Sequence, residues 1–178
     1  LGYEIGDNLI ESAEDNPKGF WEDQEVIDIN DSILEKMGIR WWDYWTPKPE
    51  EWVYKTDFSD EKRRIREFIS SMRNIGQGIA IKDPRLCRTL PLWQMVFDDL
   101  NLSVKYVEVF RNPGSVSKSL IRRNKRLPMH QQLSYYEGFR LWLRYVTESG
   151  RYCNERAVLR LIFPECVLNP EKLICHLK

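Results

Sequence analysis

Several features that mark common protein classes are missing from this chain. It has no run of about 18 apolar residues, so the sequence predicts no segment that crosses a membrane. It has two histidines and four cysteines, and none of the cysteines has the Cys-x-x-Cys spacing of a zinc or redox motif. We therefore expect free thiols, no resident metal and no disulfide framework.

The chain also has no excess of charge of one sign. Lys and Arg together number 27, and so do Asp and Glu. Proteins that bind nucleic acid or anionic membranes usually have a basic excess, so this balance argues against both kinds of partner. No signal peptide is visible in these residues, and we expect a cytoplasmic protein.

What is present suits one globular domain. The 178 residues are 42% hydrophobic and 12% aromatic, which is enough for a single core. Helices are expected at residues 23–37, 59–74 and 132–148, near Pro91 and from Asn169 and Pro170, and strands at residues 78–81, 104–110 and 157–163. The alternation predicts an α/β fold with a parallel sheet.

The strand expected at residues 104–110 leads into a candidate phosphate site. Its dense β-branched and aromatic residues predict burial on both faces. Asn112 and Pro113 end the strand and begin a helix, whose first turn should have several unpaired N–H groups that favour an anion. Arg111 adds a cation with a fork of donors, and Ser119 adds a hydroxyl further along the helix.

A second predicted strand end carries charged residues. Lys82, Asp83 and Arg85 directly follow the apolar stretch at residues 78–81. Ligands of open parallel sheets bind outside the carboxyl ends of the strands, so we expect this cluster and Arg111 to face one crevice. The alternative is a buried ion pair at the strand end.

A group of cations follows the phosphate segment. Its members are Lys118, Arg122, Arg123, Lys125 and Arg126. They either form a solvated helix face or help to hold anions, and the sequence leaves both alternatives open.

Three blocks of sequence occur in order along the chain. They are Asn16-Pro-Lys-Gly-Phe-Trp-Glu-Asp23, Ile81-Lys-Asp-Pro-Arg-Leu-Cys-Arg-Thr-Leu-Pro-Leu-Trp93, and Arg111-Asn-Pro with Ser119 after it. Together they resemble the bacterial-type sulfotransferases that use 3′-phosphoadenosine 5′-phosphosulfate (PAPS) and release 3′-phosphoadenosine 5′-phosphate (PAP). The resemblance implies a three-layer fold with a central parallel sheet, similar to that of P-loop NTPases. It also implies that Arg111 and Ser119 bind the 3′-phosphate of the cofactor, and we add Asn112 and Arg123 as cofactor-binding candidates.

One part of the family's pattern is missing. A loop of the Pro-Arg-Ser-Gly-Thr type, which holds the 5′-phosphosulfate in the family, does not occur in the sequence. In the family, a segment like Leu1-Gly-Tyr-Glu-Ile-Gly6 lies just downstream of that loop. We therefore expect a sulfotransferase domain that is cut at its N-terminus and holds only half of the cofactor, with its C-terminal completeness left open.

Sulfuryl transfer needs a base for the acceptor proton and cations for the leaving phosphate. Glu22 resembles the glutamate that serves as base in glycan and protein sulfotransferases. Alternatively, Glu22 and Asp23 only cap the helix that follows them. Lys82 and Arg85 are expected to orient the acceptor or the sulfuryl group, while Asp83 is a second candidate base or a partner that holds Lys82.

The acceptor is expected to be a small molecule or a glycan. An irregular segment at residues 39–54 is rich in tryptophan, which predicts either a ring-lined acceptor site or ordinary loop packing. His130 lies in a loop that is either an acceptor-site lid or solvated, and His176 is expected to be structural. The sequence does not predict the oligomeric state.

Two other functions stay open at this point. One is a nucleotide phosphotransferase of the P-loop type, which needs a Gly-x-x-x-x-Gly-Lys-Ser/Thr loop upstream of these residues. The other is a non-catalytic relative that binds a nucleotide or partner through the same crevice.

Overall fold

The computed structural model describes residues 2–14, 16–17, 19–72, 78–125, 132–153 and 158–168. The chain divides into two compact units, an N-terminal unit, Leu1–Ser103, and a C-terminal unit, Val104–Lys178. The expectation of one domain stays a prediction. Arg126, His130, Cys175, His176 and the terminal helix predicted from Asn169 lie outside the described residues.

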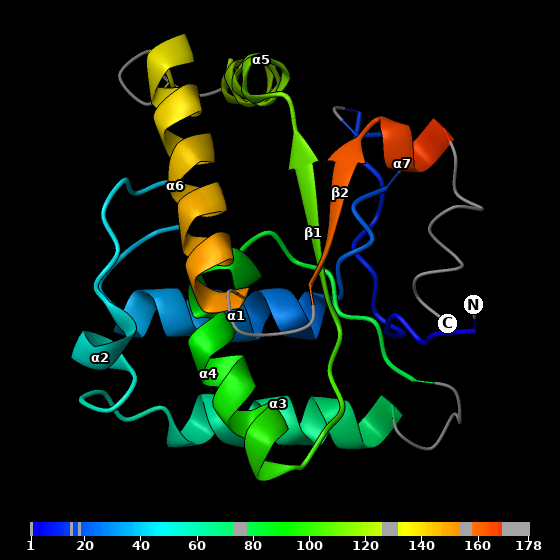
Figure 1. Cartoon of the computed structure of the whole chain (residues 1–178), viewed down its shortest axis with the longest axis vertical. Helices are drawn as coiled ribbons and strands as arrows, with labels where there is room; N and C mark the ends of the chain where they lie inside the picture. Colours follow the sequence, from blue (N-terminus) through cyan, green and yellow to red (C-terminus); the bar gives the residue numbers. More distant parts are fainter. Residues whose placement is uncertain are drawn as a thin grey trace. The chain divides into compact units, whose positions relative to one another are not determined.

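The N-terminal unit is built from helices. Its described residues form α1 (Gln24–Lys36), α2 (Pro49–Trp52), α3 (Ser59–Met72) and α4 (Leu86–Asp99). The apolar sides of α1, α3 and α4 pack against one another (Figure 1). The buried side chains that form this core include Ile29, Ile33, Ile65, Ile69, Leu92, Trp93 and Val96. Their spacing on each helix is that of one amphipathic face.

Helix α1 begins and ends where the sequence predicted. The Asp23 carboxylate accepts a hydrogen bond from the Glu25 N–H at 2.9 Å and caps the first turn. Gly38 has φ +71°, and the Ile39 N–H donates to the Leu34 carbonyl at 3.0 Å, which closes the last turn. Local capping chemistry therefore fixes both ends of this helix.

The predicted strand at residues 78–81 is wrong, because only a single parallel bridge between Ile79 and Glu4 forms there. The Glu4 N–H donates to the Gly78 carbonyl at 2.9 Å, and the Ala80 N–H donates to the Glu4 carbonyl at 2.7 Å. Gly78 has φ +110°, a backbone conformation outside the strand region, so the pairing does not extend through it.

The predicted helix start near Pro91 is also wrong, since α4 begins at Leu86 and contains Pro91. The first turn forms earlier because Asp83 provides two acceptors. Its carboxylate accepts from the Arg85 N–H at 2.8 Å, and its carbonyl accepts from the Leu86 N–H at 3.1 Å. Pro91 lacks an N–H and so removes only one bond from a helix that is already established.

One difference concerns the segment between α1 and α3. Residues 39–54 were predicted to be irregular, but they include the short helix α2. Helix α3 begins at Ser59, the residue at which it was predicted to begin. The Asp57 carboxylate accepts from the Ser59 N–H at 2.9 Å and so fixes the turn that leads into this helix.

The C-terminal unit contains a parallel strand pair with helices around it. Its described elements are β1 (Tyr106–Arg111), α5 (Pro113–Asn124), α6 (Tyr135–Cys153), β2 (Val158–Phe163) and α7 (Glu165–Leu168). The strands pair from Tyr106 opposite Val158 to Arg111 opposite Phe163. Parallel strands need a crossover, and the chain between them contains α5 and α6. This confirms the coarse prediction of an α/β fold with a parallel sheet, although α7 was not predicted.

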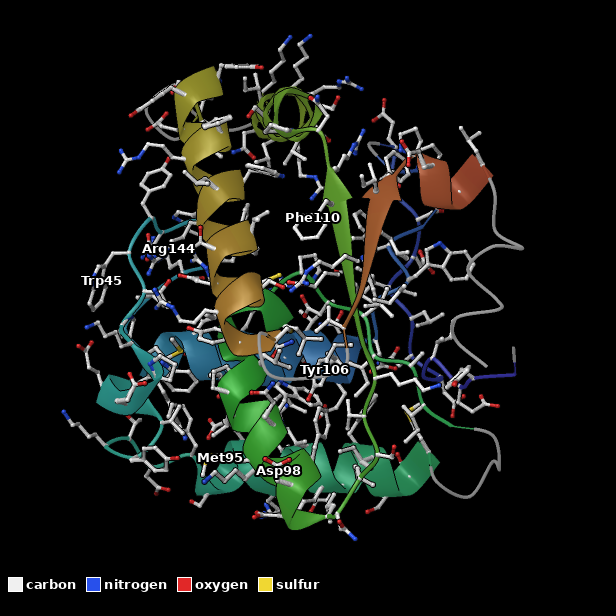
Figure 2. The ribbon with its side chains drawn as sticks, in the orientation of Figure 1. Trp45, Met95, Asp98, Tyr106, Phe110 and Arg144 are labelled. Atoms are coloured by element: carbon white, nitrogen blue, oxygen red, sulfur yellow. The ribbon has the colours of Figure 1, made fainter. Side chains whose placement is uncertain are left out.

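Burial on both faces of β1 was predicted, and this is wrong. Burial alternates along the strand, with Tyr106 and Glu108 buried but Val107 and Val109 45% and 58% exposed. Helix α6 packs against β1, and Figure 2 shows Phe110 pointing from the strand toward this helix. In the described residues the sheet has two strands, so its other face keeps part of its apolar surface open to solvent.

Cys87 and Cys153 are free thiols. Within the parts of the chain that the structure describes, no helix combines the length and the apolar character needed to cross a membrane.

Candidate functional site

Glu22 and Lys82 form an ion pair in the N-terminal unit. The backbone around Glu22 runs alongside residues 8–10, where the Ile10 N–H donates to the Glu22 carbonyl at 2.9 Å. The Glu22 side chain is 9% exposed, whereas that of Lys82 is 54% exposed. The Lys82 ammonium donates to the Glu22 carboxylate and, at 2.7 Å, to the Phe20 carbonyl. A nearly buried carboxylate therefore meets a cation that solvent can reach.

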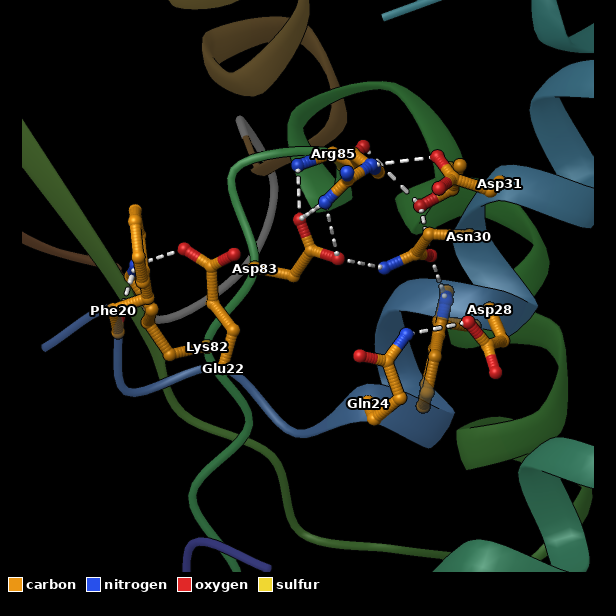
Figure 3. A network of polar contacts seen from close by, with 11 residues as sticks. Phe20, Glu22, Gln24, Asp28, Asn30, Asp31, Lys82, Asp83 and Arg85 are labelled. Carbon is orange, nitrogen blue, oxygen red and sulfur yellow. Dashed lines mark hydrogen bonds and ion pairs between the residues drawn. The ribbon is translucent and has the colours of Figure 1, made fainter. Parts of the chain in front are cut away.

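Asp83 points to the other side of the chain from Lys82 (Figure 3). It accepts from the Arg85 N–H at 2.8 Å and from the Asn30 side-chain amide at 3.0 Å. The Arg85 guanidinium also forms an ion pair with it, at 3.2 Å. The side chain of Asp83 has no exposed surface, so the buried ion pair considered as an alternative is the arrangement seen. The suggestion that Asp83 holds Lys82 is wrong, because Glu22 and Phe20 hold it instead.

Arg85 lies between two carboxylates. Besides Asp83, it contacts Asp31 of α1, with 2.7 Å between Nε and Oδ1. Burial by itself lowers the pKa of Arg85, but the charges of Asp83 and Asp31 outweigh burial and raise this pKa above its ordinary value. Burial raises the pKa of the Asp31 carboxyl above its ordinary value of 3.8, and Arg85 opposes this. Arg85 is thus a permanently charged group whose charge is largely balanced within the protein.

Asn30 holds Asp83 and Arg85 in position. Its side-chain oxygen accepts from the Thr89 hydroxyl at 2.7 Å and from the Trp93 indole N–H at 2.8 Å, while its amide donates to Asp83. Asn30 is completely buried. Our sequence reasoning missed it, although a polar residue next to Ile29 on the apolar face of α1 was a usable signal. Asn30 therefore fixes the position of Asp83 and, through it, Arg85.

In the C-terminal unit, Arg111 and Asn112 stand where β1 passes into α5. Asn112 caps α5, because its side-chain oxygen accepts from the Ser115 N–H at 3.1 Å. The exposed Arg111 guanidinium lies over the ring of Phe163, 5.0 Å from the ring centre. The strand end and helix start thus form as predicted, with a solvent-accessible cation beside the helix N-terminus.

The first turn of α5 offers fewer free donors than we predicted. Pro113 has no N–H, the Ser115 N–H bonds to the Asn112 side chain, and the Val116 N–H bonds to the Asn112 carbonyl at 3.1 Å. The Gly114 N–H has no acceptor among the described residues. Backbone recognition of an anion here therefore rests on Gly114 and the helix dipole rather than on several N–H groups.

Ser119, Arg123 and Tyr135 complete the description of this region. Ser119 and Arg123 are exposed on α5. Tyr135 was not predicted, yet its hydroxyl lies against the first turn of α5, since a Cβ added at Gly114 would be 2.6 Å from the Tyr135 oxygen. No sequence signal linked Tyr135 to Gly114, because the contact depends on how α6 packs against α5.

The structure brings the predicted residues together in two groups. Glu22 lies with Lys82, and Asp83 with Arg85, in the N-terminal unit. Arg111, Asn112, Ser119 and Arg123 belong to the junction of β1 and α5 in the C-terminal unit. The expectation that both groups face one crevice stays a prediction.

The tryptophan-rich segment is divided between core and surface. Trp52 is buried and meets Phe58 edge to face, with 5.5 Å between ring centres. Trp42 and Trp45 are exposed. The buried Arg88 donates to the carbonyls of Arg40 and Asp43 at 2.9 and 2.6 Å, which anchors the loop that carries the exposed rings.

Comparisons with protein-family models, curated proteins and solved structures found no match. In the described parts of the chain, no group of three or more His, Cys, Asp and Glu side chains is arranged to hold a metal ion.

Proposed function

We propose that this protein belongs to the PAPS-dependent sulfotransferases and transfers a sulfuryl group to a hydroxyl or amine, releasing PAP. The observation that carries the proposal is the junction of β1 and α5, where the exposed Arg111 stands beside a helix N-terminus capped by Asn112. Three features together favour a phosphate group at this point: a cation, the helix dipole, and a Gly114 N–H that has no acceptor among the described residues.

The proposal assigns the 3′-phosphate of the cofactor to this junction. Ser115 and Ser119 are exposed and lie one turn apart on α5. They are on the same side of the helix as its cap residue, Asn112. In this assignment the Arg111 guanidinium, which lies over Phe163 in the structure, turns toward α5, and the phosphate binds between it and the Ser119 hydroxyl. For the finer fold we propose three layers, a central parallel sheet flanked by helices as in P-loop NTPases, because the three sequence blocks resemble the sulfotransferases.

Glu22 and Lys82 have the chemistry that the transfer step needs. In that step the acceptor oxygen forms a bond to sulfur while the bond between sulfur and the 5′-phosphate oxygen breaks. The acceptor proton passes to the Glu22 carboxylate, and PAP leaves with the electron pair of the broken bond. The exposed ammonium of Lys82 stabilises the negative charge that grows on the leaving oxygen. Arg85, held by Asp83, orients the acceptor.

A turnover assay tests this proposal. Because the 178 residues are expected to hold only half of the cofactor, PAP release from PAPS is measured on the full-length protein and on its Glu22→Gln variant, with a panel of hydroxyl and amine acceptors. We expect acceptor-dependent release that falls by about 10²-fold or more in the variant, because general base catalysis is lost. Glu11→Gln, an exposed carboxylate of the same unit, serves as the control and should not change the rate. The absence of release with every acceptor would contradict an enzymatic role.

One observation favours a non-catalytic nucleotide-binding relative as a second candidate. Each charged group of the predicted catalytic set is already paired within the protein, Lys82 with Glu22 and Arg85 with Asp83 and Asp31. A protein of this kind would bind PAP without turning over PAPS, and Glu22→Gln would leave PAP affinity unchanged. The turnover assay combined with a PAP titration separates the two candidates.

A further inference from the structure

Trp21 has a backbone conformation that is unusual for its residue type. Its φ is +59°, in the left-handed region, where the backbone crowds the Cβ of a bulky residue. Among the described residues other than glycine, Asn101 alone shares a positive φ, and it directly follows the end of α4. Asparagine is common at such a position, so helix-end geometry explains Asn101. No local rule of this kind explains a tryptophan at position 21.

The ring of Trp21 is also open to solvent. The residue is 60% exposed, although an indole is one of the largest apolar groups that a protein can bury. The ring lies beside the backbone of Gly19, where an added Cβ would be 3.6 Å from the indole nitrogen. The protein therefore keeps a strained backbone at Trp21 without burying its ring in return.

Hydrogen bonds on both sides hold the chain in this conformation. Before Trp21, the Asn16 side-chain amide donates to the Gly19 carbonyl at 2.7 Å, and the Gly19 N–H donates to the Asn16 carbonyl at 3.0 Å. After Trp21, the Ile10 N–H donates to the Glu22 carbonyl at 2.9 Å. Strained residues persist only where their surroundings fix them, and they are concentrated at functional sites. The outlier at Trp21 therefore points to a function for its exposed ring.

The exposed ring belongs to the segment that holds the proposed catalytic pair. Phe20 and Glu22 flank Trp21 in the chain, and the Lys82 ammonium donates to the carbonyl of the first and the carboxylate of the second (Figure 3). Consecutive Cα atoms are about 3.8 Å apart, so the Trp21 side chain starts close to both bonds. One short segment of the N-terminal unit thus presents a flat apolar ring together with a carboxylate and a cation.

We propose that Trp21 is a specificity-determining residue, whose indole stacks on a flat ring of the acceptor while a hydroxyl on that ring reaches Glu22. The inference rests on the proposed function for the transfer to this hydroxyl, whereas the binding of the ring rests on Trp21. An aromatic ring and the C–H face of a pyranose both offer a flat apolar surface, so phenols and sugars share the chemistry that an indole recognises. An alcohol without a ring lacks this surface and should bind poorly.

Trp45 provides a comparison within the same unit. It is 63% exposed, nearly the same as Trp21, but its φ is not positive. It belongs to the loop that Arg88 anchors rather than to the segment that holds Lys82. The two tryptophans therefore separate the effect of an exposed indole from the effect of its position.

Nuclear magnetic resonance of the full-length protein tests the binding of the ring without turnover. The indole N–H resonances of Trp21 and Trp45 are assigned by their loss in Trp21→Gly and Trp45→Gly, and the wild type is titrated in the presence of PAP. The probes are para-cresol, methyl galactoside and isoamyl alcohol, which has no ring. We expect para-cresol or methyl galactoside to shift Trp21 in a saturable way and to leave Trp45 unchanged, and isoamyl alcohol to shift neither.

The probe that shifts Trp21 assigns the acceptor ring as aromatic or as a sugar, and either result supports the inference. Shifts of neither tryptophan with both ring probes, or equal shifts of the two tryptophans, would overturn it. A shift of Trp21 by isoamyl alcohol as large as that by the ring probes would overturn it too.

Trp21→Gly and Trp45→Gly make the same chemical change at a strained and at an unstrained position. Trp21→Gly should raise the KM of the ring acceptor by about tenfold with little change in kcat, because stacking holds the substrate and the transition state alike. It should not lower the urea midpoint, because glycine relieves the strain at φ +59°. Trp45→Gly should leave KM unchanged. An unchanged KM in Trp21→Gly, or a larger fall of its midpoint than in Trp45→Gly, would refute the role given to the ring.

These experiments separate the inference from the proposed function. A Trp21 resonance that shifts with a ring probe, in a protein that releases no PAP with any acceptor, would contradict the sulfotransferase proposal but leave the ring site standing. Acceptor-dependent PAP release with an unshifted Trp21 and an unchanged KM in Trp21→Gly would do the reverse.

Discussion

The side-chain amide of Asn30 donates a hydrogen bond to the carboxylate of Asp83 at 3.0 Å, joining residues 53 positions apart. Both side chains are buried, and Asn30 also accepts from Thr89 and Trp93. The bond links α1 to the segment that carries Lys82 and Arg85. The position of the predicted catalytic cluster therefore depends on an asparagine that takes no part in the proposed chemistry.

Asn30→Ala should destabilise the protein by about 3 kcal/mol, because it removes three buried hydrogen bonds, those of Asn30 with Thr89, Trp93 and Asp83. Urea unfolding monitored by tryptophan fluorescence measures this loss. Gln24→Ala on the same helix is the control, because the hydrogen bond from Gln24 to Asp28 lies at the surface. This variant should lose less than about 0.5 kcal/mol of stability. Similar losses in the two variants would contradict the role given to Asn30.

The two glycines of α6 should respond oppositely to alanine. At Gly138 the new Cβ would lie 2.9 Å from the backbone of Ser117, so Gly138→Ala should destabilise by about 1–3 kcal/mol through overpacking. At Gly150 a Cβ meets nothing within 4 Å, so Gly150→Ala should stabilise by about 0.5–1 kcal/mol through helix propensity. Thermal unfolding by circular dichroism compares the two. Loss of stability in Gly150→Ala, or none in Gly138→Ala, would show that α5 and α6 pack differently.

Glu61 makes the stability of the N-terminal unit sensitive to acid. Burial by itself raises the pKa of Glu61, but hydrogen bonds from Lys36 and Ser32 outweigh burial and lower it below the ordinary value of 4.5. The native state therefore binds fewer protons than the unfolded state just below pH 4.5. Stability from this group is complete above that pH and is lost as the pH falls through the lowered pKa.

Glu61→Gln tests this dependence by urea unfolding at neutral pH and in acid. The variant should be less stable at neutral pH, because Lys36 loses its buried partner, and should lose less further stability in acid than the wild type. Glu61→Gln should still lose some stability in acid, because the pKa values of Asp57 and Asp60 are lowered too. Glu67→Gln, which removes an exposed carboxylate of α3, is the control. Identical acid profiles for Glu61→Gln and the wild type would rule out this account.

Arg88 should hold the exposed tryptophan loop in place. Arg88→Met removes the donors to the carbonyls of Arg40 and Asp43 from a completely buried position, so we expect a loss of about 3 kcal/mol. Faster hydrogen exchange of residues 40–46 should accompany it. Arg40→Ala is a matched control, because Arg88 binds the backbone carbonyl of Arg40 rather than its side chain. Unchanged exchange in Arg88→Met would show that something else fixes the loop.

Local chemistry made much of the fold predictable. Asp23 and Gly38 mark the two ends of α1. Asn112 and Pro113 mark the end of β1 and the start of α5. These signals are readable in the sequence because caps and turns act over a few residues. The start of α4 was missed because the acceptors of Asp83 outweigh the simple rule that places proline near a helix start. The strand expected at residues 78–81 was wrong because Gly78 has φ +110°, a backbone conformation that glycine adopts easily and that the residue pattern does not reveal.

The candidate site was predictable only in part, for the same reason. The residues Lys82, Arg85 and Arg111 are recognisable from their places after apolar runs. Their partners are not, because the bonds of Asn30 to Asp83 and of Lys82 to Glu22 join distant parts of the chain. Burial on β1 was overestimated since composition alone does not reveal how many layers cover a strand.

The most direct test of the central claim is a calorimetric titration of the wild type and Arg111→Ala with PAP, with adenosine 5′-monophosphate as the ligand that lacks the 3′-phosphate. We expect the wild type to bind PAP more tightly than adenosine 5′-monophosphate, and Arg111→Ala to weaken PAP binding by about tenfold or more, because a charge-assisted bond is lost. Arg151→Ala, which removes another exposed arginine of the same unit, should bind PAP normally. Absence of PAP binding by the wild type, or equal binding by Arg111→Ala, would contradict the assignment of the β1–α5 junction as the 3′-phosphate site.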